Sequence, residues 1–274
     1  MPIASWVLLP LGFVVGAYGT LIGAGGGFVL VPVLLLLYPE ERPATITAIS
    51  LAVVCCNALS GSIAYARERR IDYRSGFLFA AATVPGAVIG ALVVNALPRG
   101  TFDLIFGLTL VVLALFIILR PAPSPTASPL AQVGLMRRVL IDAHGVRHEF
   151  AFSLPLGLAL SLVVGFVSSL LGIGGGIIHV PALVQLLHFP VHLATATSHF
   201  ILAVMAFAGS VVHFLNGELH PGSGLGRTVL LALGVVPGAQ LGARLSRRLV
   251  GSLIIRLLGV ALLAVGVRLL LTVR

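Results

Sequence analysis

Hydrophobic residues gather in eight long stretches, four in each half of the chain. The first four cover residues 6–37, 44–66, 76–97 and 102–119, and the second four cover 151–187, 191–215, 226–246 and 252–271. A helix of about 20 apolar residues crosses the roughly 30 Å hydrocarbon core of a bilayer. The pattern therefore predicts an all-α polytopic membrane protein.

The first stretch of each half is too long for one span and is interrupted by glycine. LIGAGGGFVLVP at 21–32 returns as LLGIGGGIIHVP at 170–181. Each glycine costs a helix about 1 kcal/mol relative to alanine. A backbone released from a helix inside lipid has to line protein or water. Each of these stretches is therefore predicted to form a hairpin of two short helices around a break.

The two motifs belong to a longer internal repeat. TAIS at 47–50 returns as TATS at 195–198, and PGAVIGA at 85–91 returns as PGAQLGA at 237–243. Repeats at a near-constant offset fix the architecture of a chain. Residues 1–119 and 151–274 are predicted to be two homologous transmembrane repeats, each with a broken hairpin followed by three spanning helices.

Residues 120–150 separate the two repeats. RPAPSPTASP at 120–129 is typical of an extended, exposed linker, and 139–150 has the pattern of a small β-hairpin. His144 and His148 fall in this hairpin, where we expect them to be solvated rather than to bind a metal.

Arginine positions bear on the orientation of the repeats, because cytoplasmic loops collect basic residues. One cluster, Arg67 to Arg74, follows the second stretch of the first half, and another, Arg244 to Arg248, follows the third stretch of the second half. If both clusters are cytoplasmic, the two repeats are inverted. Eight ordinary spans in parallel halves are the alternative, which Arg268 and Arg274 support. The sequence favours inversion.

Composition agrees with a membrane protein. The chain is 58% hydrophobic and 9% charged, and its mean hydropathy is +1.13, values that exclude a soluble domain. Its net charge of +9 comes from arginines at span ends, where orientation and lipid headgroups account for them without a nucleic-acid partner. The N-terminal MPIASW has no basic region, so no cleaved signal peptide is expected.

The paired G-x-G-G-G-x-x-x-V-P motifs, the T-A-x-S segments and the P-G-A-x-x-G-A segments resemble those of the TauE/SafE sulfite exporter family. The resemblance covers nearly the whole chain outside 120–150. It implies a permease of the bacterial inner membrane that exports sulfite, sulfonates or related organosulfur anions, driven by protons and without a cofactor. An importer of the same anions and a passive anion channel remain as alternatives, and neither the individual anion nor the oligomeric state follows.

An anionic substrate needs hydrogen-bond donors, and no arginine lies at the centre of a span. The N-termini of the broken helices and nearby polar side chains are the predicted donors. Close helix packing by glycine and hydroxyl bonds to the helix backbone are the alternative roles. The predicted substrate-binding residues are Gly23, Gly25, Gly26, Gly27, Thr47, Ser50, Asn57, Gly172, Gly174, Gly175, Gly176, Thr195, Ser198 and His199.

No carboxylate lies near the centre of a predicted span, and Asp103 is expected to act as a helix cap or dipole partner. Histidine is then the side chain suited to carry protons, since its ordinary pKa is about 6.5. His199 is the first candidate, followed by His179 and His213, and a structural role is the alternative for each. Together with Gln185 and Gln240, these histidines predict that the second half carries most of the chemistry.

An enzyme is not expected. The spans contain no Ser-His-Asp arrangement, no HExxH pattern and no metal-ligand spacing of cysteine and histidine. Cys55 and Cys56 are adjacent on one predicted helix, which disfavours a disulfide between them; a role in relaying a sulfur substrate is the less favoured alternative. Paired broken hairpins fit a secondary transporter better than a channel.

Overall fold

A computed structural model describes residues 5–119, 134–219, 223–246, 248–249 and 251–272. The helices of the first half are α1 (Leu8–Leu21), α2 (Gly27–Leu37), α3 (Pro43–Arg67), α4 (Tyr73–Val93) and α5 (Arg99–Leu119). Those of the second half are α6 (Leu154–Leu171), α7 (Gly176–Gln185), α8 (Val191–Leu215), α9 (Ser223–Ser246) and α10 (Gly251–Thr272). Six helices of the described residues are long and apolar enough to cross a membrane, which confirms the all-α polytopic architecture.

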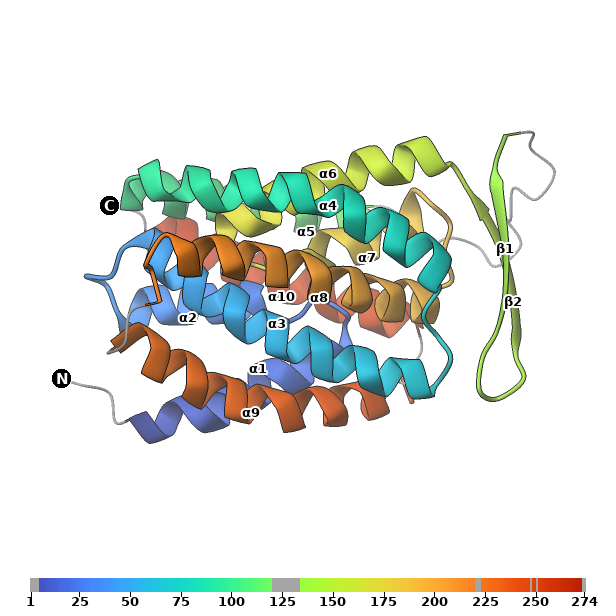
Figure 1. The fold of residues 1–274 in the computed structure, drawn as a ribbon, viewed down its shortest axis with the longest axis horizontal. Coiled ribbons are helices and arrows are strands. Elements are labelled where there is room, and N and C mark those ends of the chain that lie inside the picture. Colours follow the sequence, from blue (N-terminus) through green and yellow to red (C-terminus); the bar gives the residue numbers. More distant parts are fainter. Residues whose placement is uncertain (1–4, 120–133, 220–222, 247, 250, 273–274) are drawn as a thin grey trace.

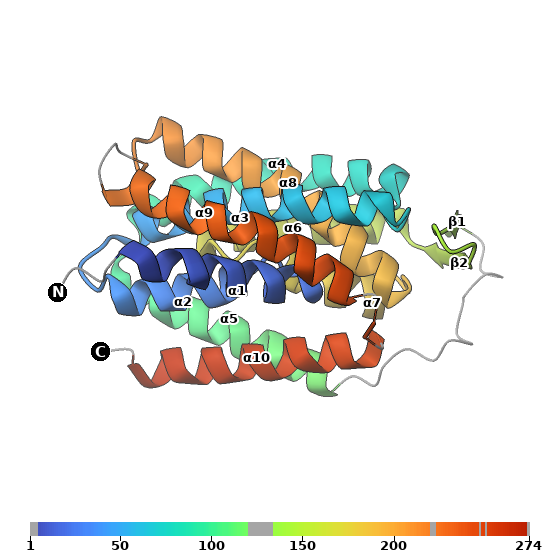
Figure 2. The same ribbon diagram turned by 90° about the horizontal axis from the view of Figure 1, so that it is seen from below.

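Each glycine-broken stretch forms two helices around its break; three of the four helices are short, whereas α6, with 18 residues, is long enough to span, contrary to the prediction of two short helices. The chain leaves α1 at Leu21 and begins α2 at Gly27, with Gly23, Gly25 and Gly26 at positive φ. Positive φ is accessible to glycine at little cost and is strained for other residues. Figures 1 and 2 show that α2 returns toward the end of the bundle from which α1 enters. The pair α6 and α7 forms the corresponding hairpin around Gly172 and Gly174.

The two halves run in opposite directions through the bundle. In Figure 1 α3 runs from left to right and its counterpart α8 runs from right to left. The α1–α2 hairpin enters from the left end, and the α6–α7 hairpin enters from the right end. These directions are the ones that inverted repeats require and that parallel halves do not produce. The domain boundaries at 119 and 151 stay a prediction, because residues 120–133 lie outside the described part.

Helices from different halves pack against each other through glycine. The α1–α9 and α4–α6 pairs are in extensive contact. A Cβ atom on Gly234 of α9 would collide with the carbonyl oxygen of Leu9, and one on Gly86 of α4 would collide with that of Leu162. Small residues let helix backbones approach closely in membranes. The packing role of glycine therefore applies to these helix interfaces.

A two-stranded antiparallel sheet covers the right end of the bundle in Figure 1. Strands β1 (Met136–Ile141) and β2 (Arg147–Phe152) pair with Val139 opposite Glu149, so the predicted hairpin is confirmed and extends beyond 139–150. Phe150 and Phe152 are buried, with ring centroids 4.4 Å and 5.1 Å from that of Phe189. These contacts fix the sheet to the α7–α8 connection.

This hairpin carries the two histidines expected in solvent, His144 in the turn and His148 on β2. His144 is 57% exposed, but His148 is only 21% exposed, with Nε2 lying 3.3 Å from Asp142 Oδ2. Desolvation acts to raise the pKa of Asp142, but hydrogen bonds from the Val146 and His144 amides and from His148 outweigh it, so the pKa of Asp142 lies below its usual value. His144 is exposed as expected, whereas His148 is only partly exposed, because Asp142 contacts its ring.

Most described arginines lie at the end of the bundle that carries the sheet. The Ala143 amide donates to Glu68 O, which places the α3–α4 connection and its arginines beside the sheet. Arg244 and Arg248, at the α9 C-terminus, lie at the same end; Arg247 is outside the described residues. Fewer described arginines lie at the opposite end, and they include the ion pairs Arg42–Glu218 and Arg227–Glu41. Since an excess of arginine marks cytoplasmic loops, the sheet end is expected to be cytoplasmic.

Candidate functional site at the crossing of the two breaks

The two glycine breaks cross each other at the centre of the bundle. A Cβ atom on Gly27, the first residue of α2, would lie 2.5 Å from the carbonyl oxygen of Ile173. One on Gly176, the first residue of α7, would collide with the carbonyl oxygen of Gly23. Each short helix therefore begins against the backbone of the other break, and only glycine leaves room for this contact.

The T-A-x-S segment of each half contacts the break of the other half. Thr195 on α8 touches Gly23, and its repeat counterpart Thr47 on α3 touches Gly172. The Ser50 hydroxyl donates a 2.6 Å hydrogen bond to Gly172 O. Thr195 Oγ1 donates to Val191 O in its own helix, which is the backbone role considered for it. The structure thus brings the predicted threonines and glycines together.

A buried polar cluster lies beside the first break. Thr20 Oγ1 donates to Asn57 Oδ1 at 2.9 Å, and Asn57 Nδ2 donates to Gly25 O at 2.9 Å. His199 Nε2 lies 3.3 Å from Thr20 Oγ1, and the Tyr65 hydroxyl donates to Thr20 O at 2.6 Å. All four side chains are fully buried. We call Thr20, Asn57, Tyr65 and His199 the first-break cluster.

This cluster draws most of its side chains from the first half, whereas the sequence pointed to the second half. Thr20, Asn57 and Tyr65 come from α1 and α3, and only His199 comes from the second half. His199 reaches across because α3 and α8 pack together at the core, where a Cβ atom on Gly61 would lie 2.5 Å from its Nε2. Thr20 and Tyr65 were not predicted. The available signal for Thr20 was a hydroxyl directly before a glycine break in an otherwise apolar stretch.

The equivalent place beside the second break has different side chains. There Leu51 corresponds to His199, Ser169 to Thr20 and Gly209 to Gly61. A Cβ atom on Gly209 would lie 2.8 Å from Ser169 Oγ and 3.0 Å from Leu51 Cδ1. The Ser169 hydroxyl makes no hydrogen bond with the described residues. Repeat symmetry therefore places the same backbone arrangement in two locations with different side-chain chemistry.

The other polar candidates make separate contacts. His179 on α7 lies with Nε2 3.2 Å from the hydroxyl of Ser161. His213 is buried, and neither ring nitrogen has a partner among the described residues. Gln240 donates to Ser60 O at 2.7 Å and so joins α9 to α3. None of these contacts joins the first-break cluster, whereas His199 belongs to it.

Asp103 does not cap α5. It is the fifth residue of that helix and pairs with Arg99 one turn earlier, Nε to Oδ2, at 3.2 Å. Cys55 and Cys56 are free thiols rather than a disulfide, as expected. No group of three or more metal-ligating side chains gathers within the described residues.

The crossing offers neutral hydrogen-bond donors. Among the described residues, the amides of Gly27, Phe28, Gly176 and Ile177 form no backbone hydrogen bond. Free amides at a helix N-terminus favour anions. The residues that carry these amides are buried, and so are the nearby side chains of Thr47, Ser198, Thr195 and Asn57. The crossing is therefore closed off from solvent.

The chain resembles known proteins over most of its length. A family model described as "Sulfite exporter TauE/SafE" matches residues 8–269. The chain is 33% identical to the probable membrane transporter protein YunE of Bacillus subtilis, over 96% of each chain. It is 26% identical to the probable membrane transporter protein YfcA of Escherichia coli, over 89% of this chain and 81% of that one. No solved structure matches.

We expect Thr20→Val to destabilise the protein. The isosteric change leaves Asn57 Oδ1 and His199 Nε2 without the hydroxyl between them, and a buried polar group that loses its partner costs about 1–3 kcal/mol. Thermal unfolding of the purified protein in detergent measures the effect. Thr109→Val is the matched control, because the Thr109 hydroxyl donates only to Ile105 O in its own helix. Equal melting temperatures for the two variants would contradict the assignment.

Proposed function

We propose that this chain, which belongs to the TauE/SafE sulfite exporter family and is an integral membrane transporter, is a proton-coupled secondary transporter. Its proposed substrates for export are sulfite, sulfonates or related organosulfur anions. The observation that carries the proposal is the buried crossing of two glycine-broken hairpins. Broken helices at corresponding repeat positions are the sequence and structural mark of a transporter binding site.

The crossing suits an oxyanion held without permanent positive charge. Sulfite and sulfonates present three oxygens, which can accept from the free amides that begin α2 and α7 and from neighbouring hydroxyls. The amides of Gly27 and Gly176 lie at the start of their helices, where the helix dipole adds favourable partial charge. Neutral donors bind the anion without the desolvated ion pair that would slow its release.

The substrate-binding role is proposed for the residues that meet at the crossing. These are Gly23, Gly25, Gly26, Gly27, Thr47, Ser50, Asn57, Gly172, Gly174, Gly175, Gly176, Thr195, Ser198 and His199. Their support is the mutual contact of the two breaks and the burial of their side chains. Ser198 adds a buried hydroxyl with no partner among the described residues.

His199 is proposed to couple anion and proton movement. The ring of Tyr65 packs edge-on against it at 5.7 Å between centroids, and Thr20 Oγ1 contacts its Nε2. Export driven by inward proton movement requires that anion and proton occupy the crossing in turn, so that His199 takes up its proton after the anion has left on the outer side and releases it inside before the next anion binds. His179 and His213 are the further candidates for this role.

Export requires the closed crossing to open at one end of the bundle at a time. Opposed hairpins in inverted halves provide two equivalent movable elements, one for each side. Import of the same anions uses the same structure with a different gradient, so it is the alternative direction. A passive channel is the alternative mechanism, and it predicts flux that ignores a pH gradient.

Flux of labelled sulfite and of small sulfonates into proteoliposomes tests this function. We expect saturable transport that increases when a pH gradient is imposed, because proton and anion movement are linked. Liposomes without protein and liposomes with the gradient collapsed by a protonophore are the controls. Saturable flux of another class of solute, with none for these anions, would overturn the proposed substrate.

We expect His199→Ala to abolish the stimulation of flux by a pH gradient while the protein still reaches the membrane. His199→Gln keeps a side chain able to bond the Thr20 hydroxyl, so it separates lost titration from lost packing. His188→Ala is the matched control, since His188 is exposed in the α7–α8 connection. If the His199→Gln variant retains the full pH dependence of wild-type flux, His199 does not carry the proton.

A further inference from the structure

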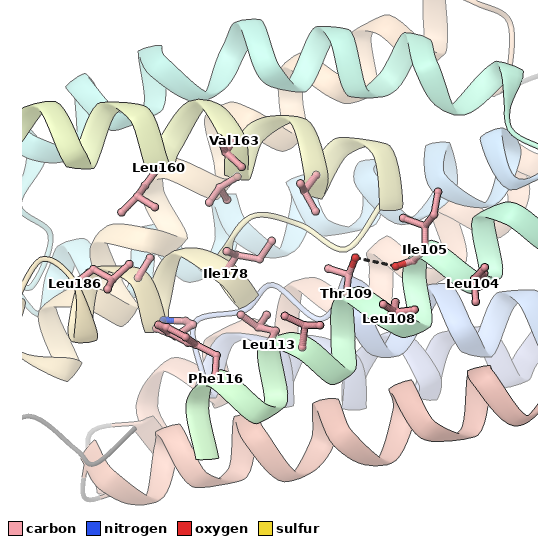
Figure 3. Close-up of a pocket in the computed structure, with 15 residues that line it drawn as sticks. Leu104, Ile105, Leu108, Thr109, Leu113, Phe116, Leu160, Val163, Ile178 and Leu186 are labelled. Atoms are coloured by element: carbon pink, nitrogen blue, oxygen red, sulfur yellow. Dashed lines mark hydrogen bonds between the residues drawn. The ribbon is translucent and has the colours of Figure 1, made fainter. Parts of the chain in front are cut away.

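An apolar cavity of about 640 Å³ lies beside α7, between α5 on one side and α6 on the other. Figure 3 shows the side chains that surround it, with Leu108 and Phe116 on α5, Val163 on α6, Ile178 on α7 and Leu186 directly after α7. Its one polar lining residue is Thr109, whose hydroxyl donates to Ile105 O in the same helix at 2.7 Å. The lining therefore offers water no free hydrogen-bond partner.

The cavity opens sideways toward the surface that faces lipid. Leu108 and Val112 of α5 are 50% and 60% exposed, and Val163 of α6 is 59% exposed. These residues line the cavity and also belong to helices of the spanning bundle. The hydrocarbon of the bilayer thus has direct access to the cavity.

A space of this size is not left empty inside a bilayer. Apolar atoms that line a void lose their dispersion contacts, and in measured cavities the loss is about 24 cal/mol per Å³. Water does not enter without two or more polar partners. Lipid tails are as apolar as leucine and surround the opening, so they are the available filling.

We propose that a phospholipid acyl chain occupies the cavity between α5 and α6–α7 as a resident ligand and supports the short helix α7. Pro181 and Ala182, in the middle of α7, form part of the lining. Helix α7 follows the second glycine break and makes limited contact with its hairpin partner α6. The acyl chain supplies packing on the face that no helix covers.

The first half provides an internal comparison. Its equivalent cavity lies between α2 and α10, includes the motif proline Pro32, and measures about 210 Å³. The cavity beside Pro181 is about three times as large by the same measure. The acyl chain is therefore assigned to the larger cavity, in the second half.

Native mass spectrometry of the full-length protein, extracted in mild detergent and stripped of loosely attached lipid, tests the assignment. Wild-type protein is expected to retain one phospholipid. Val163→Phe, which fills the cavity from α6, is expected to lose it. Val229→Phe, an equivalent change at a 49% exposed position on α9 away from the cavity, is expected to retain it. No retained lipid on the wild type, or equal retention by both variants, would overturn the proposal.

Hydrogen exchange adds a readout at α7 itself. Complete delipidation is expected to increase amide exchange over Gly176–Gln185 in the wild type, and the phenylalanine of Val163→Phe is expected to restore protection without lipid. Unchanged exchange in the delipidated wild type would show that no acyl chain supports α7. Retention of lipid only by a dimeric species would contradict the proposal, because the lipid would then depend on a second copy of this chain rather than on the cavity of one copy.

Discussion

The structure depends on one constraint, which is that backbone released from a helix inside a membrane must be enclosed by protein. Two glycine breaks meet this constraint by covering each other. Gly27 begins α2 against the carbonyl of Ile173, and Gly176 begins α7 against that of Gly23. Any side chain at these positions would force the breaks apart and expose their amides and carbonyls to hydrocarbon, where an unsatisfied group costs several kcal/mol.

The same constraint connects the fold to transport. Because the breaks are held together at the bundle centre, the T-A-x-S segments of α3 and α8 are positioned beside them, and free amides and hydroxyls converge. The two halves then differ in chemistry on a common backbone plan, with His199 and Asn57 at one break and Leu51 and Met205 at the corresponding positions of the other. A transporter built this way can use one break for polar contacts and both for movement.

Much of this fold could be predicted from the sequence, because long apolar stretches and glycine runs have few structural solutions in lipid. The helix pairs around the breaks and the small sheet followed from such local signals. The polar cluster could not be assembled from the sequence, since Thr20, Tyr65 and His199 lie far apart in the chain and meet only through the packing of α1, α3 and α8. Similarly, the ring of His148 is held by a turn carboxylate that spacing alone did not reveal.

Alternating access means that the crossing opens to one side of the membrane at a time. The accessibility of one buried position to a thiol reagent from each side measures this directly. Ser198, a fully buried residue of the T-A-x-S segment of α8, can be replaced by cysteine in a Cys55→Ala, Cys56→Ala background. The variant is then treated with a membrane-impermeant thiol reagent from each side of oriented vesicles. With alternating access, the cysteine is modified from whichever side the conditions favour opening to, and a bound anion protects it from modification. Modification from both sides under the same conditions would indicate a continuous pore and would contradict alternating access.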